Sequence, residues 1–233
     1  MTTRRTHLVT GAGSGIGAAV AAKLVARGDD VWLLARSGER AAQIAEEFPQ
    51  AHVVVADLAD PEGLEASLGD LPPRLDSLLH IAGAVELATV AEQRLDGLRR
   101  QLDVNLVAPM ELTRIALPAL RAARGLVLVV NSTAGQVANP TWTAYAASKF
   151  GARAFADGLR LEEQAHGIRV TTVFPSRTAT PMQAKVHEQE GADYDPGAWV
   201  SAESVAATIL HVVDLPVDAT IPEVTVRTAP RGS

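Results

Sequence analysis

Short runs rich in Val, Leu and Ile alternate along the chain with stretches of helical character, and this alternation limits the possible folds. The runs expected to form strands lie at residues 7–10, 30–35, 51–56, 75–81, 125–131 and 168–174. Helical stretches lie at residues 18–27, 37–48 and 143–166, and residues 90–120 contain two helical segments, with Pro109 marking a bend or an early turn. Asp60-Pro61 marks a further helix start. Near-continuous apolar strands joined by helices are typical of a parallel sheet covered on both faces. The sequence therefore predicts an α/β fold with a doubly wound parallel sheet, in a single domain over residues 1–233.

The connection from the first strand to the first helix is rich in glycine and reads TGAGSGIG from Thr10 to Gly17. Glycine tolerates positive φ and lets a backbone approach a phosphate, while the N–H groups and dipole at a helix start favour negative charge. The spacing is T-G-x-x-x-G-x-G, with Gly13 as an additional glycine. It is not G-x-G-x-x-G, because Ile16 occupies the last position of that pattern. The loop predicts a nucleotide-phosphate site; the alternative is a tight turn without a ligand.

The composition narrows the class of protein further. Of the 233 residues, 47% are hydrophobic and 21% are charged, as in ordinary globular domains, and the net charge of −6 argues against nucleic acid as the main partner. The chain has no cysteine, which excludes disulfides, thiolate metal sites and thiol catalysis. We expect no metal site and no membrane partner, because no apolar stretch approaches the roughly 18–20 residues that span a bilayer. The first apolar run is too short for a secretory signal, so we expect a cytoplasmic protein.

Further short motifs follow the predicted strands. They are Asp57-Leu58, Ala82-Gly83 in HIAG, Asn105 in DVNL, Ser132 in NSTAG, Tyr145 and Lys149 in YAASK, and Pro175 to Thr180 in PSRTAT. Together with the glycine loop, this series resembles the short-chain dehydrogenase/reductase family in its short single-domain branch, over nearly the whole chain. The resemblance implies a Rossmann fold, a nicotinamide dinucleotide as cofactor, and hydride transfer between a small carbonyl compound and its alcohol.

The catalytic candidates are Ser132, Tyr145 and Lys149. Tyr145 and Lys149 are four residues apart on one helix face, and Ser132 follows a buried strand, where open α/β sheets bind ligands. Taken alone, such a pair is more often a solvated helix face, and such a serine a turn residue. Together they suggest that Tyr145 exchanges a proton with the substrate oxygen and that Ser132 holds this oxygen. The Lys149 cation is then expected to lower the pKa of the phenol from its usual value of about 10.

Resemblance to the family assigns two further roles near these residues. It implies that Lys149 also hydrogen-bonds the nicotinamide ribose. It implies that Asn105 supports a water molecule linking the lysine to solvent. For Asn105 the alternative is packing inside a helix, or a bond to the backbone.

The residues after the second strand distinguish between the two nicotinamide dinucleotides. The strand ends at Ala35, and Arg36 and Ser37 follow, so no carboxylate is available for a free ribose 2′-hydroxyl, whereas a guanidinium can bind a 2′-phosphate. We therefore expect NADP(H) rather than NAD(H), although the glycine loop lacks the basic residue of many NADP-type relatives. For Arg36, the alternative to binding a phosphate is a solvated surface charge. For Asp57, the alternative to the cofactor contact that the resemblance implies is an ordinary turn-forming residue. By resemblance the cofactor contacts are Gly11, Ser14, Gly15, Ile16, Gly17, Arg36, Ser37, Asp57, Leu58, Ala82, Gly83, Tyr145, Lys149, Pro175, Ser176, Thr178 and Thr180.

Two positions depart from the family pattern, and one segment is expected to cover the substrate. His80-Ile81 replaces the usual Asn-Asn, and we expect His80 to be buried and hydrogen-bonded. Ser176 replaces a glycine and is expected to narrow the nicotinamide end. Residues 182–200 form a polar stretch, expected to be a small mobile lid or else a solvated helix and loop. The expected pocket walls are Gln136, Val137, Trp142, Met182, Tyr194 and Trp199. Apart from Arg177 and the charged residues of the 182–200 segment, few charges lie near the expected pocket, which favours a small neutral substrate.

The helix that carries Tyr145 contains many small residues and two phenylalanines. With the helix before it, this predicts a four-helix, two-fold interface in a homodimer or homotetramer, unless the same side chains pack inside one subunit. The side chains concerned are Leu106, Met110, Leu117, Phe150 and Phe155.

An NADP(H)-dependent oxidoreductase is the leading function. The alternatives are a non-catalytic NADP(H)-binding redox sensor, which retention of Tyr145 and Lys149 disfavours, and a sugar-nucleotide epimerase, which the loop spacing disfavours.

Overall fold

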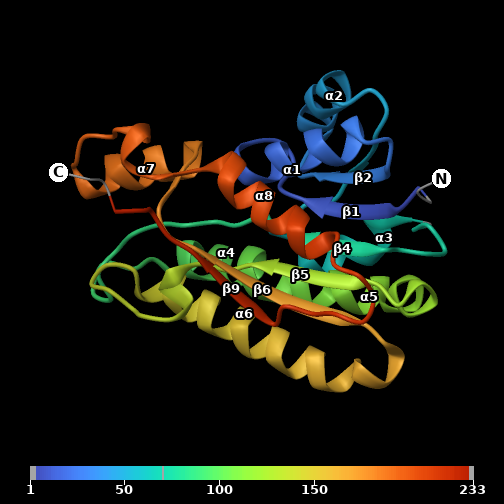
Figure 1. Ribbon diagram of the computed structural model, residues 1–233. Helices are drawn as coiled ribbons and strands as arrows, with labels where there is room; N and C mark the ends of the chain where they lie inside the picture. The colour runs from blue at the N-terminus through green and yellow to red at the C-terminus, as the bar shows by residue number, and fades with distance from the viewer. Residues whose placement is uncertain (1–3, 70, 231–233) are drawn as a thin grey trace.

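The six predicted strands join a seventh in one sheet (Figure 1). The structure, a computed structural model, describes residues 4–69 and 71–230; residues 1–3, 70 and 231–233 of the predicted domain lie outside the described residues. The strands are β1 (Thr6–Thr10), β2 (Asp30–Ala35), β3 (His52–Val55), β4 (Ser77–His80), β5 (Leu126–Val130), β6 (Arg169–Pro175) and β9 (Glu223–Val226). Their order is β3-β2-β1-β4-β5-β6-β9, and all neighbours are parallel. The predicted doubly wound α/β fold is confirmed, with its switch point between β1 and β4.

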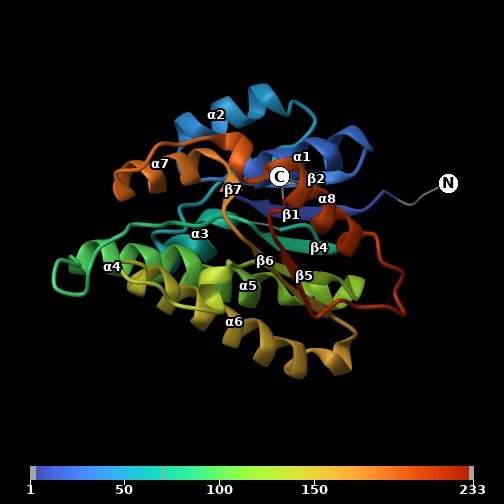
Figure 2. The ribbon, with the colours of Figure 1, turned by 60° about the vertical axis from the view of Figure 1, so that its left-hand side comes forward.

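Helices cover both faces of the sheet (Figures 1 and 2). One face carries α1 (Gly15–Ala26), α2 (Gly38–Glu47) and α8 (Ala202–Val213). The other carries α3 (Leu64–Leu68), α4 (Leu95–Leu102), α5 (Ala108–Ala123) and α6 (Thr143–Glu162). Each face has its own apolar core, and burying one large aliphatic side chain contributes about 1.5–3 kcal/mol. None of the described helices combines the length and hydrophobicity needed to cross a bilayer.

Several helix boundaries follow from residues visible in the sequence. The last predicted helix continues from α6 into a 3-10 turn at Gln164–His166 and stops at Gly167, whose φ is +73°. Pro109 lies in the first turn of α5, directly after a π-helical turn, and proline has no N–H to donate to that turn. A π-helical turn at Asp103–Val107 joins α4 to α5 and carries Asn105. Such turns are frequent at functional sites.

The C-terminal third contains elements that the sequence analysis did not predict. They are α8, β9, and a two-stranded pair of β7 (Thr178–Ala179) and β8 (Val200–Ser201). The helix α7 (Pro181–Glu190) lies in the segment for which the sequence analysis gave a helix and loop as one alternative. The strand β9 is half-buried at the sheet edge, and Glu223 and Thr225 interrupt its apolar residues, so it gives no continuous apolar run. The helix α8 is rich in Val and Ile, residues that favour strands when read by propensity alone.

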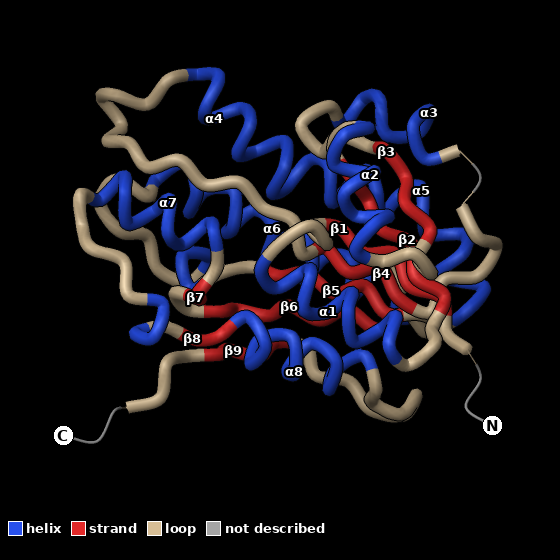
Figure 3. Tube along the Cα trace, turned by 90° about the horizontal axis from the view of Figure 1, so that it is seen from above, coloured by secondary structure: helices blue, strands red, loops and turns tan. Residues whose placement is uncertain are grey.

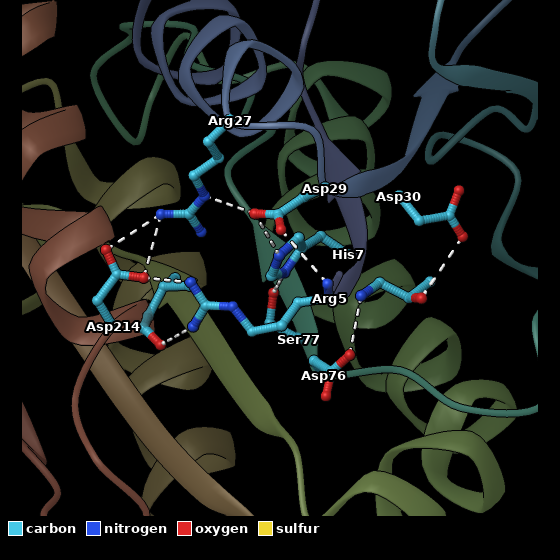
Figure 4. Close-up of polar contacts among 10 residues, drawn as sticks. Arg5, His7, Arg27, Asp29, Asp30, Asp76, Ser77 and Asp214 are labelled. Atoms are coloured by element: carbon cyan, nitrogen blue, oxygen red, sulfur yellow. Dashed lines mark hydrogen bonds and ion pairs between the residues drawn. The ribbon is translucent and has the colours of Figure 1, made fainter. Parts of the chain in front are cut away.

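A polar network lies at the end of the sheet where β1 begins (Figure 4). His7 is fully buried; its Nδ1 lies 2.7 Å from Ser77 Oγ and its Nε2 lies 3.3 Å from Asp29 Oδ2. Arg27 bonds both Asp29 and Asp214. Burial lowers the pKa of His7 to about 4, because it disfavours the imidazolium more than the Asp29 carboxylate favours it. This histidine is therefore neutral in the folded protein at ordinary pH.

Candidate active site

A cavity of about 980 Å³ opens where the parallel strands end. Residues that follow β1 through β6 form its wall, as expected for ligand sites in open α/β sheets, and α7 lies beside β7 at this side of the molecule (Figure 3). Most predicted site residues line it: Gly11, Ser14, Gly15, Ile16, Gly17, Arg36, Asp57, Leu58, Ala82, Gly83, Ser132, Tyr145, Lys149, Pro175, Ser176, Thr178 and Thr180. Ser37 and Asn105 are not part of the wall.

The glycine loop is shaped by close backbone packing. Gly11 has a φ of +78°, and a Cβ added there would lie 2.8 Å from the backbone of Ala82. A Cβ at Gly17 would lie 2.1 Å from the carbonyl oxygen of Gly11. The helix α1 starts inside the loop at Gly15, earlier than predicted, and the side chain of Ser14 makes no capping hydrogen bond. The first N–H groups of α1 therefore have no side-chain acceptor there, as an anion site at a helix start requires.

One end of the cavity lies between the glycine loop and α2. Arg36 is exposed at this end, and Asp57 forms a turn by accepting a hydrogen bond from the N–H of Ala59 at 3.0 Å. Ser37 is exposed beside this end, and its hydroxyl accepts from the N–H of Arg40 at 3.3 Å and caps α2. Arg40, which the sequence analysis did not single out, lines the cavity and donates to the carbonyl of Gly13.

The three catalytic candidates meet in the cavity near the ends of β5 and α6. Ser132 lies close enough to Tyr145 for its side chain to lower the pKa of the phenol, and both residues line the cavity. Lys149 lies one turn further along α6, with its Nζ 5.7 Å from the centroid of the Tyr145 ring. This Nζ also donates to the carbonyl of Val130 at 3.0 Å, and Asn131 Nδ2 donates to the carbonyl of Lys149 at 2.9 Å. The end of β5 thus holds the lysine at both its ammonium group and its backbone.

The pKa of Tyr145 shifts in the direction opposite to our expectation. Burial raises it to about 12 and outweighs the hydrogen bond from Ser132, which lowers it. Burial also lowers the pKa of Lys149 to about 8. The expected lowering by the lysine cation is therefore wrong for this structure: both side chains are more than nine-tenths buried, and desolvation of each charged form dominates. In this environment the phenol holds its proton firmly.

Asn105 connects the loop after β4 to helix α6 and is not part of the cavity wall. Its Nδ2 donates to the carbonyl of Ala84 at 2.8 Å and to Ser148 Oγ at 2.9 Å, while its Oδ1 accepts from the N–H of Ala84 at 2.8 Å. This is the backbone-bonded alternative of the sequence analysis. A Cβ added at Gly83 would lie 3.4 Å from Asn105 Oδ1 and 3.8 Å from Lys149 Nζ, so this glycine lies between the two side chains.

The structure confirms the prediction for His80. It is 3% exposed, its Nε2 lies 2.9 Å from Thr113 Oγ1, and burial lowers its pKa to about 3. It does not line the cavity. Ser176, the other departure, does line it, and its hydroxyl oxygen is buried without a hydrogen-bond partner among the described residues.

At the other end of the cavity an arginine joins the α7 region to the start of α6. Arg177 makes two hydrogen bonds to the Glu190 carboxylate, at 2.6 and 2.7 Å, and its guanidinium lies 5.8 Å from the Trp142 ring and 5.4 Å from the Trp199 ring. The Trp142 ring in turn contacts the Tyr145 ring edge-on, with a centroid separation of 5.6 Å. The α7 region is thereby connected to the candidate catalytic tyrosine.

The predicted pocket walls are only partly correct. Trp142 and Met182 line the cavity, whereas Gln136, Val137, Tyr194 and Trp199 do not. Lining residues that the sequence analysis missed are Arg40, Val85, Arg100, Val104, Asn139, Gln183 and Val186. The one-turn spacing of Arg100 and Val104 was a usable signal, because residues four apart on a helix share a face.

The surface of α5 and α6 divides the predicted interface residues. Met110 and Phe150 are 47% and 44% exposed, and the neighbouring Val107 is 42% exposed. Leu106, Leu117 and Phe155 instead pack against the core of their own chain. An apolar surface therefore exists on these helices, but it is smaller than predicted.

The cavity suits a nicotinamide dinucleotide. It is continuous from Arg36 and Asp57 at one end to Ser132 and Tyr145 at the other, and it passes the unprotected start of α1. The guanidinium of Arg36 can bind a phosphate group, and the backbone N–H groups at the start of α1 can bind a pyrophosphate. The protonated phenol of Tyr145 can donate to a reacting carbonyl oxygen.

Comparisons with known proteins agree with this arrangement. A family model for short chain dehydrogenases matches residues 5–191. Dehydrogenase/reductase SDR family member 7B from Xenopus laevis is 30% identical over 225 residues, which is 88% of this chain and 70% of the relative. An oxidoreductase of the short chain dehydrogenase/reductase family from Burkholderia thailandensis superimposes with a TM-score of 0.83 at 30% identity, covering 97% of this chain and 92% of that one. A short chain dehydrogenase from Escherichia coli CFT073, complexed with NADPH, gives a TM-score of 0.83 at 29% identity, with 95% of each chain covered.

Proposed function

The chain belongs to the short-chain dehydrogenase/reductase family and is an oxidoreductase of that family, and on this premise we propose that it interconverts a small carbonyl compound and its alcohol with NADP(H). The observation that carries this proposal is the meeting of Ser132, Tyr145 and Lys149 in one cavity that reaches the glycine loop. A redox sensor would not need these three side chains together.

Tyr145 acts as the proton donor when the carbonyl is reduced. The nicotinamide ring supplies the hydride when it is bound. As the substrate carbonyl carbon accepts the hydride, its oxygen becomes alkoxide-like and far more basic than a phenolate, so even a phenol with a pKa of about 12 protonates it. The Ser132 hydroxyl donates a hydrogen bond to the same oxygen and stabilises the developing charge.

Lys149 stabilises the phenolate that remains after the transfer. With a pKa of about 8, its ammonium group is mostly protonated at neutral pH, and it lies close to the ring. Its charge then favours the phenolate within a buried environment, where electrostatic interactions are strong. Asn105 supports this step indirectly, because it fixes the loop at Ala84 against α6.

Arg36 supports NADP(H) as the cofactor. It follows the end of β2, where a carboxylate would select a free ribose 2′-hydroxyl, and no carboxylate stands at that position. The similar Escherichia coli protein was captured with NADPH, which agrees with this assignment. We further propose that residues 182–200 form a lid over the substrate, and that the chain forms a homodimer or homotetramer through α5 and α6.

A substrate panel tests the proposal. Purified protein is mixed with NADPH or NADH and a set of aldehydes and ketones, and oxidation of the reduced nicotinamide is followed by absorbance. We expect turnover with at least one neutral carbonyl compound, faster with NADPH than with NADH. Arg36→Ala should weaken the binding of NADPH more than the binding of NADH. Equal losses for both dinucleotides would refute the cofactor assignment.

A further inference from the structure

The first turn of α2 brings a second guanidinium to the cavity beside Arg36. Arg40 is half-buried and lines the cavity. Its Nη2 donates to the carbonyl of Gly13, and its Nη1 donates to Gln43 Oε1 at 2.5 Å. These two bonds hold the guanidinium against the glycine loop. Arg36, in contrast, is exposed, and its side chain makes no hydrogen bond or ion pair with the described residues.

A side chain at position 13 would meet the Arg40 guanidinium. Gly13 is not among the glycines with positive φ, so its backbone conformation does not require glycine. A Cβ at this position would lie 2.5 Å from both Nε and Nη2 of Arg40. Any other residue would therefore push the guanidinium away from the loop. The additional glycine makes room for the arginine.

We propose that Arg40 is a second cationic ligand of the cofactor's ribose 2′-phosphate and that, with Arg36, it determines the preference for NADP(H). This inference rests on the proposed function. A guanidinium has five N–H donors, and the bonds to Gly13 and Gln43 use two, so three remain for phosphate oxygens. The glycine loop has no basic residue of its own, and Arg40 supplies the positive charge from α2.

The charges around this part of the cavity suit a phosphate dianion. Among the described residues of the wall, Asp57 is the only carboxylate, and Arg36 and Arg40 oppose it. Arg40 is already fixed by its two hydrogen bonds, so binding a phosphate costs it less side-chain entropy than it costs the free Arg36. Arg40 therefore contributes at least as much selectivity as Arg36.

Titration calorimetry with 2′,5′-ADP and 5′-AMP isolates the contribution of the 2′-phosphate, because the two ligands differ in that group alone. For Arg40→Met in the full chain, we expect the affinity for 2′,5′-ADP to fall about tenfold, while that for 5′-AMP changes less than about twofold. Arg99→Met, which removes an exposed arginine outside the cavity wall, should leave both affinities unchanged. Gly13→Ala keeps Arg40 but displaces its guanidinium. This variant should also bind 2′,5′-ADP more weakly, with little change in its affinity for 5′-AMP.

The outcomes separate this inference from the proposed function. If the wild-type chain binds 2′,5′-ADP no more tightly than 5′-AMP, the NADP(H) preference itself is wrong. If the wild type prefers 2′,5′-ADP, and Arg36→Met but not Arg40→Met removes that preference, only the role of Arg40 is overturned. Equal weakening of both ligands by Arg40→Met would also overturn it, because the arginine would then only support the loop.

Discussion

Replacing His7 by Gln should reduce the loss of stability that the protein suffers on acidification. His7 is fully buried between Ser77 and Asp29 (Figure 4), and its pKa in the folded protein is about 4, against 6.5 for an exposed histidine. Between these two pH values, His7 is mostly protonated in the unfolded chain but neutral in the folded chain. The stabilisation is therefore fully present above about pH 6.5 and is lost as the pH falls toward about 4.

The size of the effect follows from the pKa shift. One unit corresponds to about 1.4 kcal/mol, so the whole shift amounts to about 3 kcal/mol of unfolding free energy. About 2 kcal/mol of this is lost between about pH 7.5 and about pH 5. Buried His80, whose pKa is about 3, adds a similar loss over that interval, so the wild type should lose about 4 kcal/mol from its two histidines.

Urea unfolding at these two pH values, at one protein concentration, measures the effect. His7→Gln lowers stability at both pH values through altered packing, but that cost cancels when the same variant is compared with itself. We expect the variant's loss on acidification to be about 2 kcal/mol smaller than that of the wild type. An equal loss in both proteins would refute the assignment of a neutral, strongly desolvated His7.

Three further substitutions test other parts of the molecule. Glu190→Gln removes the ion pair with Arg177 that connects α7 to the cavity. In steady-state kinetics, we expect the KM for the carbonyl substrate to rise about threefold to tenfold, with a smaller change in kcat. An unchanged KM would show that the ion pair does not hold α7 in place. Phe150→Glu puts a charge on the exposed apolar surface of α6 and should convert the proposed oligomer into monomers in light scattering; an unaltered mass would exclude that surface as the interface. Asn105→Ala removes three hydrogen bonds from buried groups and should lower the urea-unfolding free energy by about 2–4 kcal/mol, and a loss below about 1 kcal/mol would contradict the bracing role.

The central strands and the catalytic trio could be predicted from sequence because their signals are local. β1, β2, β4, β5 and β6 are apolar runs, Gly167 ends a helix where predicted, and Pro109 lies in an early turn of α5. The motifs at the strand ends then converge on one edge, because parallel strands end together. The edge strand β9 lacked such a signal, since alternating Glu223 and Thr225 leave it without an apolar run.

The features that the sequence analysis missed depend on contacts between distant segments. The approach of Arg40 to Gly13 requires α2 to fold back against the glycine loop, and no spacing in the sequence reports that contact. The pKa of Tyr145 was predicted from its neighbour Lys149, but depth of burial decides its direction. Burial is a property of the whole packed structure, so the sequence motif alone could not reveal it.

Tyr145→Phe tests the proposed proton transfer most directly. The substitution removes only the phenolic oxygen, and the ring still packs against Trp142. Once the panel has identified a carbonyl substrate, we predict that kcat falls by at least about a thousandfold, while the NADPH dissociation constant measured by fluorescence stays within about threefold of wild type. Turnover near the wild-type rate in this variant would contradict a catalytic role for the Tyr145 proton.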